Sequence, residues 1–257
     1  MPRAVQVPDI RKVDLPEARQ AIPYVHAYLR ECILNGTLPP GTKLSQVSLA
    51  AQLGISRTPL REVLRMLQEE GLVEIEPNQR TRVAGLDPQE LDDVYASRIL
   101  LETLALSMTV GHFGAKSRAE ASRMLTAMRR AARTGDFTAW FAAHADYHRL
   151  CSAAAGEAMQ RQLRAFADRA TRYIRICQLS EPSSWQAAGD VEHAAILDAL
   201  INGDEQRALT EMAHHLARTA LRVLADCAPD FVPVAVPHAV ALIDREPPAA
   251  LRLTGAG

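Results

Sequence analysis

Apolar residues recur every three or four positions through most of the chain, which is the spacing of helices that bury one face. Near the N-terminus this spacing predicts helices over residues 22–35 and 45–53, each ending close to a glycine. A third helix is predicted to begin at Ser56, with Leu60 and Leu64 in its buried stripe. The opposite side of that third helix is basic.

Strands are predicted next. Residues 72–75 form an alternating apolar run, a Pro-Asn turn follows, and a second short run spans 81–83, so the two runs form a hairpin. Three helices followed by a hairpin make a winged helix-turn-helix, a fold that places one helix in the major groove of DNA. We place this domain at residues 21–86, after a polar leader of residues 1–20.

Helical spacing dominates from residue 87 onward, where no strand pattern appears. We therefore expect a mostly α fold, in which the winged helix-turn-helix (three helices plus a β-hairpin wing) precedes an all-helical bundle over residues 87–228. The tail of residues 229–257 is rich in proline and alanine, and we expect it to be extended or partly disordered. The helices of the bundle are predicted at residues 88–112, 117–133, 136–154, 158–179, 189–202 and 204–227.

Composition places the chain among folded globular proteins. Of its 257 residues, 48% are hydrophobic and 23% are charged, unlike the composition of disordered chains. Neither a run of 18 apolar residues nor a secretory signal appears, so we expect a cytoplasmic location. The cysteines lack C-x-x-C spacing, so we expect reduced thiols at all four positions, mostly in the core. They are Cys32, Cys151, Cys177 and Cys227.

Net charge alone does not indicate a partner. The formal charge is −1, but residues 1–86 carry 11 Lys and Arg against 9 Asp and Glu, or +2, and the remainder carries 18 against 21, or −3. So small a basic excess gives little affinity for DNA through the phosphate backbone. DNA binding must therefore depend on the placement of a few arginines and on dimeric binding.

The arginines of the third predicted helix are placed for DNA contact. Ser56, Arg57 and Thr58 stand at its N-terminus, where free backbone N–H groups attract phosphate and side chains reach base edges. Arg57, Arg61 and Arg65 follow at intervals of four residues and share one face. Arginine can bind guanine through two hydrogen bonds or clamp a phosphate. We expect Arg57 and Arg61 to contact DNA, whereas Arg65 is equally explained as a solvated surface charge.

The same region contains a Pro-Gly turn, a Leu-Ala helix, the helix start Ser-Arg-Thr-Pro-x-Arg-Glu and a Glu-Gly-Leu entry to the wing, all within residues 38–73. In these motifs and their spacing it resembles the GntR family of bacterial regulators, which implies that Arg57 and Arg61 hold DNA-contacting positions. Val47 departs from the family, whose members often carry an arginine there. The wing tip departs too, and we expect Arg80, with Arg82, to supply its contact to phosphate or the minor groove.

Four of the eight histidines form an ordered series in the helical region, His144, His148, His193 and His215. The first two are one helical turn apart, so both rings project from one face and can bind the same ion, while the others come from two further helices. Hydrogen-bonded core or surface histidines are the alternative. His214 should face away from His215, at the surface or behind the site.

The segments around these histidines contain a His before an apolar helical run and a last His just before Leu, and over residues 90–220 they resemble the FCD ligand-binding domain of the FadR-type GntR subgroup. The resemblance implies that the four positions hold a metal ion. It also implies a homodimer that binds double-stranded operator DNA and a small carboxylate-type metabolite as effector. An arginine assists the effector in that family, and Arg98 and Arg172 are the candidates here, although either can form a structural salt bridge.

One position departs chemically from the resembled family, because His144 stands where its first metal ligand is an Asp. Asp146 is two residues along the helix and points away. Four neutral imidazoles leave the charge of the ion uncompensated and favour a divalent transition metal, zinc first and nickel next, over magnesium or calcium. An anionic effector would be attracted.

Two other functions are compatible with parts of this pattern. A metal ion with open positions can activate water, so a hydrolase fused to a DNA-binding module is one alternative. The sequence has no H-E-x-x-H motif, and Glu157 and Glu192 are candidates for a general base only by proximity. A constitutive DNA-binding protein with structural histidines is the other. We expect a metabolite-responsive transcriptional regulator and not an enzyme.

Overall fold

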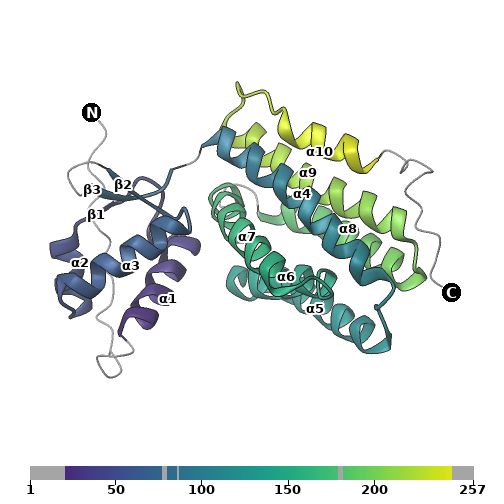
Figure 1. Cartoon of the computed structure of the whole chain (residues 1–257), viewed down its shortest axis with the longest axis horizontal. Coiled ribbons are helices and arrows are strands. Elements are labelled where there is room, and N and C mark those ends of the chain that lie inside the picture. Colours follow the sequence, from purple (N-terminus) through teal and green to yellow (C-terminus); the bar gives the residue numbers. More distant parts are fainter. Residues whose placement is uncertain (1–20, 77–79, 86, 179–181, 245–257) are drawn as a thin grey trace. The chain divides into compact units, whose positions relative to one another are not determined.

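The computed structural model describes residues 21–76, 80–85, 87–178 and 182–244 (Figure 1). The chain divides into two units. One holds the described residues up to Asp87 together with residues 167–178, and the other holds residues 88–166 and 182–244. Helices account for most of the described residues, which confirms the mostly α fold class.

The N-terminal elements form the predicted winged helix-turn-helix. They are α1 (Ala21–Leu34), β1 (Lys43–Leu44), α2 (Gln46–Leu53), α3 (Arg57–Glu69), β2 (Val73–Glu76) and β3 (Arg80–Val83). The sheet has the order β1-β3-β2, with both pairs antiparallel and Ile75 opposite Thr81 in the hairpin. The two-residue strand β1 is an addition that the hydrophobic pattern did not predict.

Apolar packing fixes α3 within this unit. α3 packs against α1 and α2, and Ser45 and Gly54 define the ends of α2. The Ser45 side chain accepts a hydrogen bond from the backbone N–H of Ser48, and Gly54 adopts a φ of 70°, which favours glycine. Burial of a leucine side chain contributes about 1.5–3 kcal/mol. The fully buried residues of α3 are Leu60, Val63, Leu64 and Leu67.

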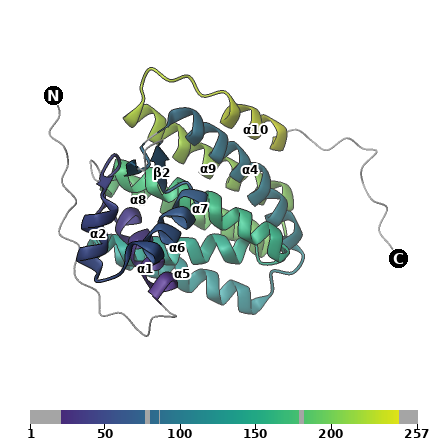
Figure 2. The ribbon, with the colours of Figure 1, turned by 60° about the vertical axis from the view of Figure 1, so that its left-hand side comes forward.

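The remaining elements belong mainly to a helical bundle (Figure 2). They are α4 (Pro88–Val110), α5 (Ala115–Thr134), α6 (Phe137–Cys151), α7 (Glu157–Gln178), α8 (Pro182–Asn202), α9 (Glu205–Cys227) and α10 (Ala235–Ile243). α4 packs against α9 and α10, and α5 packs against α6 and α8. All six predicted bundle helices are present, although α8 begins earlier than expected. α7 contributes residues to both units.

The C-terminal tail differs from the expectation, because part of it forms α10. The buried carboxylate of Asp92 in α4 accepts hydrogen bonds of 2.8–2.9 Å from the backbone N–H groups of Val234, Ala235 and Val236. These groups have no partner within the helix that they start. The prediction of an extended tail is therefore wrong for these residues, since a side chain distant in sequence completes the helix N-terminus.

The cysteines agree only partly with the expectation. Cys32 and Cys151 are buried free thiols. Cys227 is disulfide-bonded, so the prediction of a reduced thiol is wrong there, because sequence separation does not limit which thiols folding brings together. The side chain of Cys177 lies outside the described residues. Within the described chain, no helix has the length and apolar character needed to span a membrane.

Candidate metal centre and DNA-reading face

The basic face of α3 lies at the protein surface. Ser56, Arg57, Thr58 and Arg61 are all exposed. Ser56 occupies the N-cap position, as predicted, but its side chain makes no capping hydrogen bond. The first backbone N–H groups of a helix have no intrahelical acceptor, so this end of α3 can accept a phosphate.

Arg61 and Arg65 differ in the charge of their neighbours. Arg61 donates from Nε to Oε1 of Gln46 in α2, at 3.2 Å, and this neutral partner leaves its charge uncompensated. Arg65 forms ion pairs within α3, at 2.6 Å with Glu62 and also with Glu69. The geometry therefore supports Arg61 as a DNA contact more strongly than Arg65.

Of the two wing arginines predicted to contact DNA, the structure describes the side chain of one. Arg82 on β3 is exposed and lies 2.7 Å, from Nε to Oε2, from Glu74 on β2. The side chain of Arg80 lies outside the described residues. Val47, on α2, is 64% exposed, so this helix presents an apolar side chain where an arginine would reach DNA in the resembled family.

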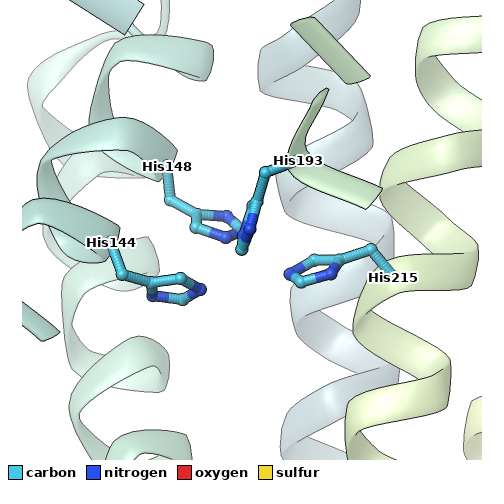
Figure 3. A group of neighbouring side chains, drawn as sticks. All are labelled: His144, His148, His193 and His215. Atoms are coloured by element: carbon cyan, nitrogen blue, oxygen red, sulfur yellow. The ribbon is translucent and has the colours of Figure 1, made fainter. Parts of the chain in front are cut away.

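The four predicted histidines meet inside the helical unit (Figure 3). His144 and His148 lie one turn apart on α6, a helix whose N-terminus is capped by Asp136 through the backbone N–H of Ala139. His193 comes from α8 and His215 from α9. One nitrogen from each ring lies within 4.8 Å of a nitrogen from every other ring.

Three of the rings are oriented by hydrogen bonds at Nδ1. His148 Nδ1 lies 2.8 Å from Oε2 of Glu102, and His215 Nδ1 lies 2.7 Å from Oε2 of Glu192. A backbone hydrogen bond to Gly189 holds His193 from the same helix, and it involves Nδ1 because Nε2 is unpaired. A ring that donates from Nδ1 presents the Nε2 lone pair to a ligand.

The unpaired nitrogens test whether a metal ion fits here. Among the described residues, Nε2 of His148 and Nε2 of His193 are buried without a hydrogen-bond partner. Such a group costs about 1–3 kcal/mol when it stays unpaired, and ligation would remove that cost. In a tetrahedral zinc site with bonds of about 2.1 Å the ligand nitrogens lie about 3.4 Å apart, so the rings would rotate inward to bind one ion. The residues fit a transition metal.

The lowered pKa values of these histidines also favour metal binding. Burial, followed by the neighbouring histidines, holds the pKa of His144 and of His193 well below the usual value. Burial and then His148 lower the pKa of His215 to about 3. Neutral imidazole is the form that binds a metal ion.

Arg98 lies next to this cluster but is engaged by a carboxylate. It is buried, and its Nε and Nη2 each lie 2.8 Å from Oε1 of Glu102. Its positive charge contributes to the lowered pKa of His144 and of His215. The side chain of Arg172 lies outside the described residues.

The sequence prediction missed Glu102, which links Arg98 to His148. Its position four residues after Arg98 was the available signal, because such a spacing permits an ion pair on one helix face. Glu192 was considered only as a possible base, whereas here it accepts from His215 and from Arg218.

Asp146 and His214 lie outside the cluster, as the spacing predicted. Asp146 pairs with Arg149 at 2.7 Å. His214 is exposed, with Nε2 3.1 Å from Oδ2 of Asp244. Glu157 is 87% exposed, which does not suit a general base poised beside a buried metal ion.

Comparison with known proteins agrees with this architecture. Residues 24–83 match the model described as "Bacterial regulatory proteins, gntR family", and residues 93–218 match that of the FCD domain. The probable D-xylose utilization operon transcriptional repressor of Paenarthrobacter nicotinovorans is 31% identical over 185 residues, which are 72% of this chain and 80% of that protein. The solved structure of E. coli McbR/YncC has a similar fold, with a TM-score of 0.69 and 20% identity over 79% of this chain and 96% of that chain.

Some matches are shorter. The uncharacterized HTH-type transcriptional regulator YdhC of Bacillus subtilis (strain 168) is 34% identical over 82 residues, which are 32% of this chain. The match covers 37% of YdhC, so it extends over only a minority of that relative.

A winged helix-turn-helix with an exposed basic helix, followed by helices that enclose a cluster of histidines able to hold a metal ion, defines a ligand-responsive DNA-binding regulator. The chain belongs to the GntR family of bacterial regulatory proteins and contains an FCD domain. Proteins of the GntR family bind operator DNA, and FCD domains bind small effectors. The matched families and relatives are transcriptional regulators and not enzymes, which excludes the hydrolase alternative.

Proposed function

We propose that this chain is a cytoplasmic, homodimeric transcriptional regulator of the FadR-type subgroup, in which a metal-bound carboxylate effector changes operator binding. The ion is zinc, with nickel as the alternative. Its ligands are His144, His148, His193 and His215.

The observation that carries this proposal is the pair of buried, partnerless Nε2 atoms of His148 and His193, next to two further imidazoles. Hydrogen-bonded core histidines would use both ring nitrogens or expose the second to solvent. Rings that are hydrogen-bonded at Nδ1 and unpaired at Nε2 are instead typical of metal ligands, whose other nitrogen is held by a neighbouring carboxylate or backbone group.

The charge around the site supports an anionic effector. The carboxylates of Glu102 and Glu192 face the guanidinium groups of Arg98 and Arg218, so these four formal charges cancel. The ligands are neutral, and a divalent ion therefore keeps its charge of +2. A carboxylate group both ligates such an ion and neutralises part of that charge. Arg98 and Arg172 remain candidates for a second contact to the effector.

In the DNA-binding unit, Arg57 and Arg61 read base edges while Ser56 and Thr58 hold a phosphate at the start of α3. Arg80 and Arg82 of the wing contact the adjacent backbone or minor groove. Each subunit of the dimer binds one half-site, and the effector alters affinity by favouring one arrangement of the two DNA readers.

The test uses full-length protein and a DNA site selected from a random duplex library. Affinity for that DNA is measured with zinc-loaded protein across a panel of small carboxylates, and again after chelation. We expect at least one carboxylate to shift the affinity of the loaded protein and none to shift that of the stripped protein. The variant His193→Ala should behave like the stripped protein. A response that survives removal of all metal would refute the metal-centred proposal.

A further inference from the structure

The four histidines of the cluster are not equivalent. His148, His193 and His215 each have an Nδ1 partner, whereas no hydrogen bond or ion pair holds the ring of His144 within the described structure. His144 instead stacks on the indole of Trp140, with ring centres 4.8 Å apart and planes inclined by 18°. Stacking restrains the plane of a ring but does not fix a lone pair on one point.

Exposure separates the two histidines of α6 from those of α8 and α9. His193 and His215 are buried, at 1% and 5% exposure, and the side chain of His148 is 10% exposed and held by the buried Glu102. His144 is partly exposed. The two histidines of α6 are therefore the more exposed members of the cluster, and of these two only His148 is anchored, by Glu102.

We propose that His144 is the exchangeable ligand of the metal centre: the three anchored histidines retain the ion, and an incoming anionic donor takes the position of His144, whose ring then rests on Trp140. The inference rests on the proposed metal-centred function and adds how the effector gains access. In the exchange, the bond from the metal to the His144 nitrogen breaks and a bond from the metal to the donor atom forms. The imidazole leaves as a neutral ring, so no proton or electron is transferred.

This arrangement resembles that of open metal sites, in which some ligands are fixed and one position exchanges. Three protein ligands hold the ion and the fourth position exchanges in catalytic zinc sites, whereas structural sites use four fixed ligands. Here the fourth ligand is a side chain that the fold has left without an anchor. The ion is then four-coordinate both before and after the effector binds.

The first experiment compares metal retention in full-length variants, with cobalt(II) as a probe whose visible spectrum reports coordination. Wild type and the control His214→Ala, which removes an exposed histidine outside the cluster, should bind one ion per chain. His144→Ala should also bind one ion, with a changed spectrum. His148→Ala and His193→Ala should lose the ion under the same conditions. Circular dichroism confirms that each variant is folded.

The outcomes separate the two proposals. If wild type binds no cobalt, the proposed metal-centred function fails. If wild type binds cobalt but His144→Ala loses it as completely as His193→Ala, the metal centre stands and the exchangeable-ligand inference fails.

The second experiment uses azide, a small monodentate anion. If His144 occupies the ion about nine-tenths of the time, azide should bind the cobalt form of wild type about tenfold more weakly than that of His144→Ala. Equal azide affinity in the two proteins would overturn the inference. In zinc-loaded Trp185→Phe, where Trp140 is the one remaining tryptophan, azide should change the fluorescence as it binds. An unchanged Trp140 signal at saturating azide would likewise count against exchange of His144.

Discussion

Each anchored histidine of the cluster uses its two ring nitrogens differently. Nδ1 is bound to a carboxylate or a backbone group, and Nε2 faces the other rings. Glu102 is central to this division. Burial alone raises the pKa of its carboxyl group, but Arg98 and then His148 outweigh burial and lower that pKa to about 2. Glu102 is therefore ionised at neutral pH and holds His148 in the tautomer that presents Nε2.

Replacing Glu102 with glutamine tests this positioning role. Glu102→Gln keeps the size of the side chain but removes the anion that orients His148 and pairs with Arg98. Loss of such an outer partner typically weakens metal binding about 10- to 100-fold, and we expect a change of that size. Competition with a chromophoric chelator measures the zinc affinity.

The matched control is Glu157→Gln, which removes the same charge from an exposed position on α7. It should leave zinc affinity within about twofold of wild type, since an exposed ion pair contributes little. Equal effects of the two substitutions would show that Glu102 acts only through overall charge.

On the DNA-reading face, the local partners of two arginines separate their roles. Arg61→Ala should weaken binding to the selected DNA site by about 1–3 kcal/mol if Arg61 makes a bidentate base contact. Arg65→Ala should have a smaller effect, because Glu62 and Glu69 already neutralise Arg65. Fluorescence anisotropy at fixed salt measures both. Equal losses would mean that α3 acts through charge alone and that neither side chain reads a base.

At the scale of elements, α10 depends on a single side chain of α4. Asp92→Ala removes the acceptor of three backbone N–H groups, and loss of a helix N-cap costs about 0.5–2 kcal/mol. The amides of Val234, Ala235 and Val236 should then exchange with solvent about 2- to 30-fold faster. Amide hydrogen exchange measures this directly. Asp93→Ala, at an exposed position whose carboxylate accepts a hydrogen bond from the Gln89 side chain, should leave these amides unchanged.

The contrast between α10 and the other helices shows what local sequence can predict. The helices of the bundle carry apolar residues at helical spacing over several turns, so each was predicted. α10 is short, contains Pro237 in its first turn and lies in a Pro- and Ala-rich segment. Its start depends on Asp92, more than 140 residues away. Strand β1 was missed for a related reason, since two residues cannot show a period.

In the candidate site, too, local relations could be predicted from the sequence and contacts between helices could not. Helical spacing placed His144 and His148 on one face of α6, because that relation is local. The anchoring carboxylate of His148 comes from α4, and nothing in the sequence specifies which helices pack together at that point. Glu102 therefore could not be assigned to the site, although its local pairing with Arg98 was predictable from their spacing.

For the whole molecule, the small net charge means that DNA affinity depends on few contacts. The described basic side chains of the first unit are partly compensated, as Arg65 and Arg82 are by neighbouring glutamates. Binding that neutralises few phosphates has a shallow dependence on salt. The proposed dimer would present two copies of α3 and would thereby account for the affinity of a regulator with this charge.

Metal binding should stabilise the helical bundle, because a bound ion joins side chains of α6, α8 and α9. At a free zinc concentration about 100-fold above Kd, ligation contributes about 2.7 kcal/mol to the folded state. We expect zinc to slow amide exchange in α6, in α9 and in the part of α8 around His193. Exchange in full-length wild type is compared with that in His193→Ala, in which zinc should have no effect. Zinc protection that persists in His193→Ala would place the ion elsewhere, whereas protection confined to α6 would mean that His144 and His148 bind the ion without the other two helices.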